Sequence, residues 1–196
     1  MDKPIKAYNK VVFYQTEYRK VKHPRLEFKT GILKLIVPKD WKETEAELLL
    51  KHEKWIMSKH DQIEVSLDRS EGEQLKVKRD INSFKGFVRK TLDEYLSPLK
   101  VEIKRLDFKT MKTKWASCSQ NRIITVNTLM RYLPDNLVRY VLFHEISHLE
   151  ERKHNKHFWN IIEKKFKNPK SKEQDLMMYW FLIQKQGVGR GNEHAR

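Results

Sequence analysis

The feature that most constrains this chain is one predicted helix that is apolar on most sides and still carries two histidines and a glutamate. From Pro134 the sequence reads PDNLVRYVLFHEISHL. The segment Pro134 to Asn136 is typical of a helix start, and the apolar residues that follow indicate burial on most sides. Ionisable side chains are costly to bury without a partner. The fold must therefore supply one to His144, Glu145 and His148.

The spacing of these side chains suits a metal ion. His144 and His148 stand four residues apart, so on a helix they share one face at about 6 Å along the axis. Glu145 projects in a neighbouring direction and can reach a water at the metal without binding the metal, which is the general-base position of H-E-x-x-H. A charged helix with histidines is the simpler alternative. The buried context favours zinc, and the glutamate indicates hydrolysis.

A catalytic zinc needs a third protein ligand and an open position for water. His154 is the first choice, because it follows the charged segment that we expect to end the helix. Asn155 then is the expected N-cap of a second amphipathic helix, so the chain can turn back over the metal. His157, one turn into that helix, is the main alternative, and Glu150 and Glu151 are weaker ones.

Three pieces of the sequence resemble the YgjP-like metallopeptidases, relatives of the SprT-like and Wss1-like zincins. They are the strand motif Trp115 to Ser119, the H-E-x-x-H helix, and the element that ends in Phe158 and Trp159. The resemblance implies a zincin-like fold, one zinc ion per chain in an HExxH-x5-H arrangement through His154, and the motif glutamate as catalytic base. More loosely, it extends over the amino-terminal half.

Two positions depart from the family pattern. Ala116 stands where the family usually has glycine, and Lys153 stands where asparagine is common. Alanine is the smallest possible change and should be tolerated unless the glycine's backbone angle is required. The long metzincin motif shares the spacing to the third histidine, but Glu151 occupies its glycine position and no Met-turn follows, so we reject that interpretation.

The resemblance also suggests residues that contact substrate. In zincins a sheet edge beside the metal helix typically binds the substrate backbone as an added strand, and Trp115 and Ser117 are candidates for that role. A purely structural hairpin is the alternative. By chemistry alone, His157, Tyr132 and Tyr179 are candidates to stabilise an oxyanion beside zinc, each with a structural role as the alternative.

Composition bounds the location of the chain. Cys118 is the single cysteine, which excludes an internal disulfide framework and fits a reducing compartment. We interpret it as a buried thiol, not as a nucleophile. No apolar run follows Met1 and none approaches the length of a membrane span. We therefore expect a cytoplasmic protein with no membrane partner.

The net charge of +15 indicates a possible second kind of partner. The excess is spread evenly along the chain, which favours a lysine-rich surface over a concentrated nucleic-acid footprint. The functional interpretation is attraction to DNA or RNA, useful to a peptidase that acts on nucleic-acid-associated proteins. The alternative function is a basic nucleic-acid-binding protein with a structural zinc site and no peptidase activity. Structural zinc sites usually have four ligands, often cysteines.

Hydrophobic periodicity divides the chain. Period-two stretches at Val11 and Phe13, at Leu26 and Phe28, and from Ile32 predict strands. A helix is expected over about 44–63 with Thr44 and Glu47 as a capping box, followed by a connector to Lys78. Asp80 opens a helix with an apolar stripe, and a strand and a hairpin near Gln120 follow. A last amphipathic helix is expected to begin near Ser171.

The sequence thus predicts an α+β protein with a strand-rich amino-terminal region over 1–78, a zincin-like catalytic domain over 79–186 and a flexible tail over 187–196. The predicted function is that of a zinc metalloendopeptidase, which hydrolyses a protein or peptide through a zinc-activated water with Glu145 as general base. No oligomeric state is predicted.

Overall fold

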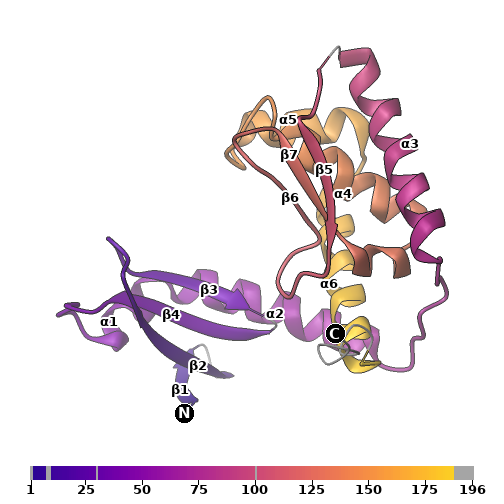
Figure 1. The fold of residues 1–196 in the computed structure, drawn as a ribbon. Coiled ribbons are helices and arrows are strands. Elements are labelled where there is room, and N and C mark those ends of the chain that lie inside the picture. The colour runs from indigo at the N-terminus through magenta and orange to yellow at the C-terminus, as the bar shows by residue number, and fades with distance from the viewer. Residues whose placement is uncertain (1, 8–9, 30, 100, 188–196) are drawn as a thin grey trace, which may run out of the picture. The chain divides into compact units, whose positions relative to one another are not determined.

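The computed structural model, drawn as a ribbon in Figure 1, describes residues 2–7, 10–29, 31–99 and 101–187. The chain divides into two compact units, residues 1–68 (unit 1) and residues 69–196 (unit 2). Each unit combines strands with helices, so the predicted α+β class is confirmed. Of the expected tail, all but Gly187 lies outside the described residues. No helix in the described ranges is both long and apolar enough to cross a membrane.

Unit 1 contains a four-stranded sheet, here called sheet A, in the order β1-β2-β4-β3. The outer pairs are antiparallel, whereas the two central strands are parallel. The first strand was not expected from the sequence, and the other three were. The strands are β1 (Lys3–Ala7), β2 (Lys10–Arg19), β3 (Arg25–Lys29) and β4 (Ile32–Pro38).

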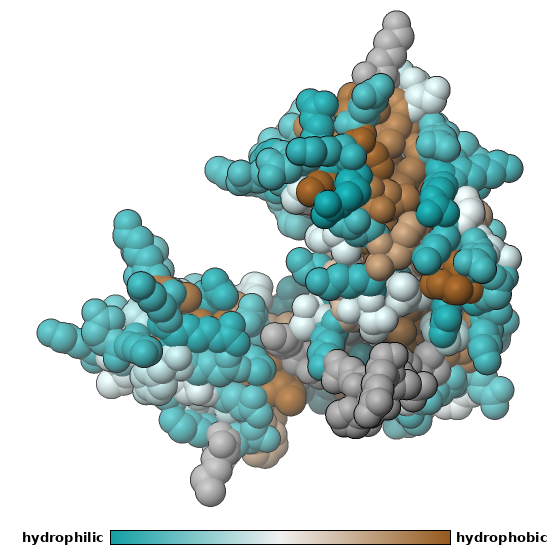
Figure 2. Space-filling view, in the orientation of Figure 1, coloured by the Kyte–Doolittle hydropathy of each residue, from teal (hydrophilic) through white to brown (hydrophobic). Residues whose placement is uncertain are grey.

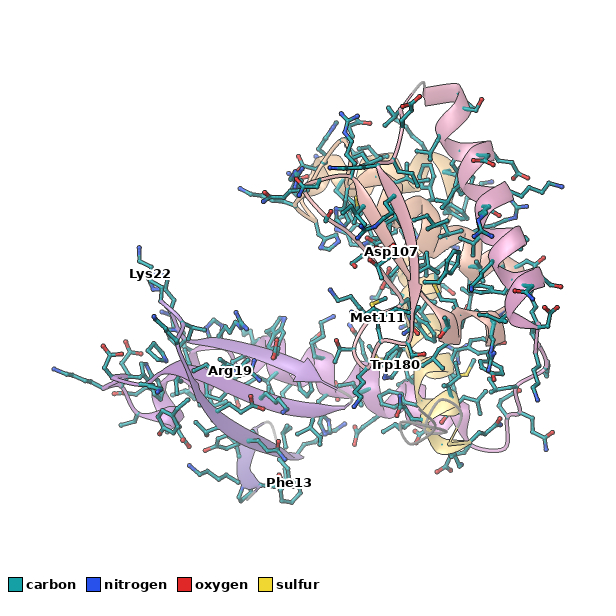
Figure 3. The ribbon with its side chains drawn as sticks, in the orientation of Figure 1. Phe13, Arg19, Lys22, Asp107, Met111 and Trp180 are labelled. Carbon is teal, nitrogen blue, oxygen red and sulfur yellow. The ribbon has the colours of Figure 1, made fainter. Side chains whose placement is uncertain are left out.

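The strand at Val11 and Phe13 is confirmed, but these two side chains do not belong to the core. They are 45% and 57% exposed, and Phe13 is labelled on β2 in Figure 3. Val12 and Tyr14 are buried instead and pack with Leu33 of β4. Successive side chains of a strand point to opposite faces, so a period-two pattern predicts the strand without saying which face is covered.

Two helices follow sheet A in unit 1, α1 (Glu45–Lys51) and α2 (Glu53–Ser70). The predicted capping box is confirmed, since the Glu47 amide donates to Thr44 Oγ1 and the Thr44 amide donates to the Glu47 carboxylate. His52 ends α1, which divides the stretch expected as one helix. The second helix extends to Ser70, into residues expected as a connector. Leu48, Leu49, Ile56 and Met57 from these helices pack on the sheet.

Unit 2 contains a three-stranded sheet, sheet B, in the order β5-β7-β6. The pair β5 and β7 is parallel, whereas β6 and β7 form the predicted hairpin, so β6 is an edge strand. Figure 1 shows α3 and α4 beside this sheet. The elements are α3 (Ile81–Leu99), β5 (Arg105–Lys109), β6 (Ala116–Cys118), β7 (Ile123–Asn127), η1 (Thr128–Tyr132), α4 (Asp135–Ser147), α5 (Lys156–Lys165) and α6 (Pro169–Lys185).

The core of unit 2 lies between the helices and one face of sheet B. The apolar stripe of α3 is buried as predicted, and Phe84 meets Phe108 of β5 edge to face, with ring centroids 6.2 Å apart. Ile124 and Val126 of β7 face the same core, as do most apolar residues of α4. On the outside, hydrophilic side chains cover most of the face of each unit that Figure 2 shows. The long apolar helix is therefore enclosed, as its sequence requires.

The helices α3 and α6 begin in different ways. Asp80 caps α3, because its Oδ1 accepts from the amides of Asn82 and Ser83. The last helix begins at Pro169, not near Ser171, with Asn168 at its N-cap in the left-handed region at φ 54°. Proline is favoured in the first turn of a helix, where its missing N–H costs nothing. The helix start near Ser171, which the sequence predicted with Ser171 as its cap, therefore lies two residues too late.

Candidate metal centre

Three histidines lie together at the carboxyl end of α4. His144 is on the last turn of this helix, His148 is its C-cap, and His154 lies in the segment that leads to α5. One ring nitrogen of each lies within 4.8 Å of the others. The Nε2 atoms of His144 and His154 are 2.9 Å apart. The structure thus brings together the three histidines that the sequence predicts as metal ligands.

Phe158 forms an apolar floor for this histidine group. Its ring stacks on His148 at 4.7 Å and meets the edges of His144 and His154 at 4.9 and 4.7 Å. The predicted N-cap of α5 is confirmed, since the Phe158 amide donates to Asn155 Oδ1 at 3.0 Å. This cap sets where α5 begins, and hence places Phe158 against the three rings.

The outer nitrogens of the two α4 histidines face oxygen atoms. Nδ1 of His148 lies 3.0 Å from the backbone carbonyl oxygen of Glu151. Nδ1 of His144 lies 3.9 Å from Oε1 of Glu173, a residue of α6. An oxygen next to Nδ1 favours the tautomer with the proton on Nδ1, which leaves the Nε2 lone pair for a metal.

The protonation of the histidines fits a metal as well. Burial, together with the neighbouring rings of His148 and His154, lowers the pKa of His144 to about 3. Burial likewise lowers the pKa of His154. Neutral imidazole is the form that binds metals, and three such nitrogens on an open site are a donor set typical of zinc. The residues present therefore fit the ion that the sequence predicts.

Glu145 is buried between α4 and the edge strand of sheet B. Glu145 is 8% exposed, and the backbone amide of Cys118 donates a hydrogen bond to its carboxylate. Burial raises the pKa of Glu145 to about 7, although the Cys118 amide and the charge of Lys114 act in the opposite direction. A carboxyl group with such a pKa can accept and return a proton near neutral pH.

His157, the alternative third ligand and an oxyanion candidate, lies elsewhere. Its side chain is 60% exposed, and its Nε2 is 3.4 Å from a carboxylate oxygen of Glu150. The group of possible metal ligands around His144 contains His154 and not His157. The other weak candidate, Glu151, uses its side chain to accept the Lys153 amide. Among these residues, His154 is the one that the fold places with the α4 histidines.

The two tyrosines predicted to stabilise an oxyanion, Tyr132 and Tyr179, make their described contacts with residues other than the three histidines. Tyr132 is buried with Leu129 and Ile183, and its hydroxyl accepts from the Arg131 guanidinium at 2.6 Å. Tyr179 of α6 is half-buried against the core, and burial raises the pKa of its hydroxyl. Both sets of contacts are structural in character.

The strand motif lies on β6, the edge strand beside α4. Trp115 precedes this strand and packs edge to face on Trp180 of α6, with centroids 4.9 Å apart; Trp180 is labelled in Figure 3. Ser117 is half-buried opposite Thr125 of β7. Cys118 is half-buried, and burial and then Glu145 raise the pKa of its thiol, as expected for an unreactive cysteine.

Both departures from the family pattern are accommodated. Ala116 is buried in β6 and is not among the described residues with positive φ, so no glycine is required there. The backbone of Lys153 takes part in the turn that carries His154, since its carbonyl accepts the Asn155 amide at 2.8 Å. The Lys153 amide also donates to the Glu151 carboxylate, and both contacts use the backbone, so a lysine side chain is compatible with them.

Two contributors to the site were missed in the sequence. Glu173 lies on a different helix from His144 and has no fixed spacing to the motif. Tyr140 is on α4 and reads as one more core residue, yet its hydroxyl donates to Glu173 Oε1 at 2.6 Å. Neither role leaves a local signal, because both depend on how α6 packs on α4.

A second group of possible ligands lies in unit 1. It comprises His60, Asp61 and Glu64 of α2. Here Lys10 Nζ already lies 2.9 Å from Asp61 Oδ1 and 2.6 Å from Glu64 Oε2. An ammonium group between the carboxylates neutralises the charge that a cation would need, so this group fits a metal less well than the histidines do.

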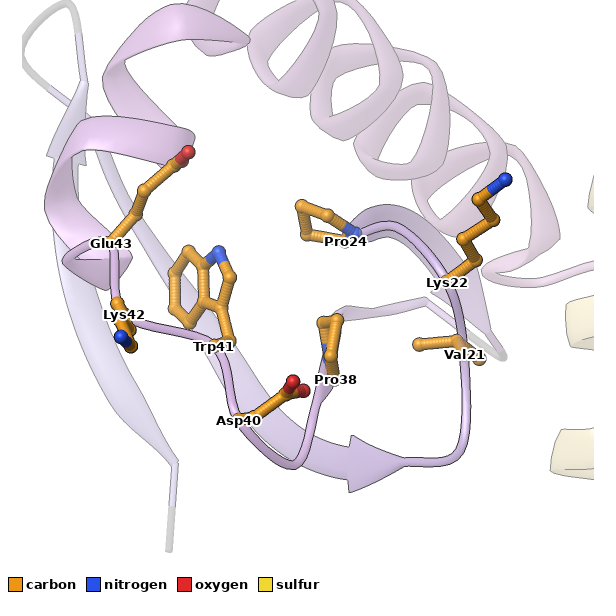
Figure 4. A pocket seen from close by; sticks show the side chains of 8 residues that line it. All are labelled: Val21, Lys22, Pro24, Pro38, Asp40, Trp41, Lys42 and Glu43. Carbon is orange, nitrogen blue, oxygen red and sulfur yellow. The ribbon is translucent and has the colours of Figure 1, made fainter.

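Unit 1 also contains a pocket of about 440 Å³, shown in Figure 4. Prolines and an indole form much of its wall, and its lining includes no histidine or cysteine. The lining residues are Val21, Lys22, Pro24, Pro38, Asp40, Trp41, Lys42 and Glu43. Among the described residues, the group of side chains best suited to bind a metal ion thus lies in unit 2.

Comparison with known proteins gave a family match that includes this region. The family described as "YgjP-like, metallopeptidase domain" matches residues 80–179, just over half of the chain and the whole histidine group. The comparison with curated proteins gave no match.

Two solved structures are similar to part of the chain. The metallopeptidase zymogen of Pyrococcus abyssi abylysin is 24% identical with a TM-score of 0.41, covering 50% of this chain and 93% of that one. The metallopeptidase zymogen of Methanocaldococcus jannaschii jannalysin is also 24% identical with a TM-score of 0.41, covering 56% of this chain and 99% of that one. The assignment rests on the family match: the chain belongs to the YgjP-like metallopeptidase family.

Proposed function

We propose that this protein is a zinc-dependent endopeptidase in which His144, His148 and His154 hold one zinc ion and Glu145 is the general base. The observation that carries the proposal is the convergence of three ring nitrogens within 4.8 Å of one another, next to a buried carboxylate on the same helix. A group of three histidines leaves a zinc position open for chemistry, whereas structural zinc sites are usually closed by four ligands.

Bound zinc supplies a Lewis acid, which polarises a peptide carbonyl and lowers the pKa of a water. Glu145 accepts the proton of the attacking water and returns it to the leaving amine. Its position supports both steps, because the Cys118 amide holds the carboxylate against β6 while burial keeps its pKa near 7. Phe158 excludes water from beneath the rings, which favours neutral imidazoles.

The edge of β6 supports a binding site for an extended substrate. The amide of Asn127 donates to the Trp115 carbonyl and the amide of Ser119 donates to the Ile123 carbonyl, both across to β7. Hydrogen-bonded pairs alternate along an antiparallel ladder, so Ser117 also pairs with β7. The backbone N–H and C=O of Ala116 and the C=O of Cys118 then face the open edge, where a peptide can add as a strand, while the Cys118 N–H bonds Glu145.

This register refines the roles of the two substrate-binding candidates. Ser117 directs its backbone to β7, so it would brace the edge strand, and Trp115 would do the same through Trp180. The backbone of Ala116 is the part of the motif best placed to contact a substrate.

Nucleic-acid-associated proteins are a candidate substrate class. Exposed lysines at the end of α5, in the turn after it and at the start of α6 concentrate positive charge within a few residues: Lys164, Lys165, Lys167 and Lys170. Such a cluster can bind phosphates, and affinity for DNA or RNA would then fall steeply with salt. The single cysteine supports activity in the cytoplasm, the compartment we propose.

The decisive experiment measures zinc content and peptide cleavage on wild type, Glu145→Gln and the control Glu163→Gln, which changes an exposed glutamate of α5. We expect about one zinc per chain in all three, as a three-histidine site requires. Cleavage should fall by about 10²- to 10⁴-fold in Glu145→Gln only, the usual contribution of a general base.

Three results would count against the proposal. Absence of zinc in reconstituted wild type would overturn the metal centre. Zinc with undiminished cleavage in Glu145→Gln would overturn the role of Glu145. Zinc and salt-sensitive DNA binding without any cleavage would instead support the nucleic-acid-binding alternative.

A further inference from the structure

Glu173 lies against the outer nitrogen of His144. Its Oε1 accepts a hydrogen bond from the Tyr140 hydroxyl at 2.6 Å, and the same oxygen is 3.9 Å from His144 Nδ1. The opposite nitrogen of that ring, Nε2, lies 2.9 Å from His154 Nε2. One ring nitrogen of His144, Nδ1, is therefore turned to the carboxylate, and the other, Nε2, is turned to the histidine group.

Tyr140 is well placed to hold this carboxylate still. It is fully buried, and its ring meets Phe166 edge to face at 5.4 Å and His144 at 6.3 Å. Glu173 itself is 47% exposed at the side chain, so several rotamers of its carboxylate are sterically open. The hydroxyl selects those in which Oε1 stays near His144.

The two α4 histidines are supported in different ways. His148 has a backbone carbonyl, that of Glu151, 3.0 Å from Nδ1. No side-chain substitution removes that oxygen. His144 has a carboxylate in the corresponding place, which carries charge and can be altered by mutation. A carboxylate beside the outer nitrogen of a metal-binding histidine fixes its tautomer and increases its basicity.

Resting on the proposed zinc centre, we propose that Glu173 is a positioning residue, which together with Tyr140 keeps the proton of His144 on Nδ1 and its Nε2 lone pair directed at the metal. The separation of 3.9 Å exceeds that of a direct hydrogen bond, so the carboxylate acts through electrostatic attraction to the Nδ1–H group. Glu173 touches neither metal nor substrate in this arrangement.

Two readouts test this role. Zinc affinity is measured by competition with a chelator, and the tautomer of His144 is measured in the metal-free protein by ¹⁵N NMR of its imidazole. The variants are Glu173→Gln, which keeps the size and an oxygen acceptor but removes the charge, Tyr140→Phe, and the two combined. Glu163→Gln is the matched control, a glutamate on the exposed side of α5.

We expect Glu173→Gln to weaken zinc binding by about 10- to 100-fold, the range typical of losing an outer partner of a metal ligand. Tyr140→Phe should weaken it less, and it should add little in the Glu173→Gln background, since the hydroxyl acts through the carboxylate. Metal-free Glu173→Gln should show a smaller Nδ1–H population at His144. Its thermal unfolding should match that of wild type.

Zinc affinity within twofold of wild type together with an unchanged tautomer in Glu173→Gln would overturn the role of Glu173 and leave the proposed function intact. Failure of wild type to bind zinc would overturn the metal centre and this inference with it. If Glu173→Gln is poorly folded, Tyr140→Phe carries the test, and an unchanged zinc affinity and tautomer in that variant would contradict the proposal.

Discussion

The Nε2 atoms of His144 and His154 lie 2.9 Å apart, although His144 belongs to α4 and His154 to the segment that follows it. The chain leaves α4 after its last turn and reverses before Asn155 begins α5. Phe158 then packs beneath both rings. The third histidine thus reaches the pair on the helix through a turn, not through helical spacing.

His154→Ala should weaken zinc binding much more than His157→Ala. Loss of a direct ligand should exceed the roughly 10- to 100-fold effect of losing an outer partner. His157 is largely exposed and lies beside Glu150, so its removal should leave the affinity close to that of wild type. Chelator competition on both variants measures the difference. Equal losses would assign His157 to the metal as well.

Ala116→Pro should lower kcat/KM for peptides by about 5-fold, because one net hydrogen bond is worth about 1 kcal/mol. Proline removes the backbone N–H that faces the open edge of β6, and by the register of the hairpin this N–H makes no bond to β7. Zinc content should not change.

Ser117→Pro is the contrasting variant for the edge strand. It removes a donor that pairs with β7, so it should lower the thermal unfolding temperature. If Ala116→Pro cleaves peptides as well as wild type does while remaining folded, substrate does not bind along this edge.

Asn127→Ala should lower the free energy of unfolding by about 3 kcal/mol, since buried groups left unpaired cost about 1–3 kcal/mol each. The side chain is fully buried. It accepts from the amides of Met111 and Leu129, and it donates to the carbonyls of Met111 and Lys114.

Urea unfolding of Asn127→Ala measures this loss, with Asn160→Ala as the control. Asn160 is exposed on α5, so its removal should change the free energy of unfolding by less than about 1 kcal/mol. A similar small change for Asn127→Ala would mean that the loop before β6 does not depend on these hydrogen bonds.

Glu45→Gln should destabilise unit 1 at pH 7 and much less at pH 3. Burial raises the pKa of Glu45. Hydrogen bonds from Lys3, Thr16 and Tyr14 lower this pKa by a larger amount, so the net shift is downward. A lowered pKa in the folded state stabilises the fold above the unfolded pKa, and this stabilisation is lost as the pH falls through the folded value. The loss at pH 7 should be on the order of 1 kcal/mol, because Lys3 is half exposed.

Thermal unfolding of Glu45→Gln and wild type at pH 7, 5 and 3 measures this dependence. Glu43→Gln, which changes an exposed neighbour, is the control and should alter stability by less than about 0.5 kcal/mol. A gap between Glu45→Gln and wild type that persists unchanged at pH 3 would contradict the role of the Glu45 charge.

Much of the candidate site was predictable because its signals are local. The apolar run of α4, the spacing of His144 and His148, and the Asn155 cap each depend on residues within one or two helical turns. The capping box of Thr44 and Glu47 and the β6–β7 hairpin are local in the same way. Such features form under short-range geometry, and the structure reproduces them.

What the sequence by itself determined, then, is the identity and spacing of the α4 motif and the caps and turns around it. Tertiary structure decided which face of β2 is buried, so Val12 and not Val11 joins the core. It also decided that Glu173 of α6 stands behind His144, and that Asn127 ties the loop before β6 to η1. These relationships arise where distant elements pack together, and periodicity and capping act over too few residues to specify them.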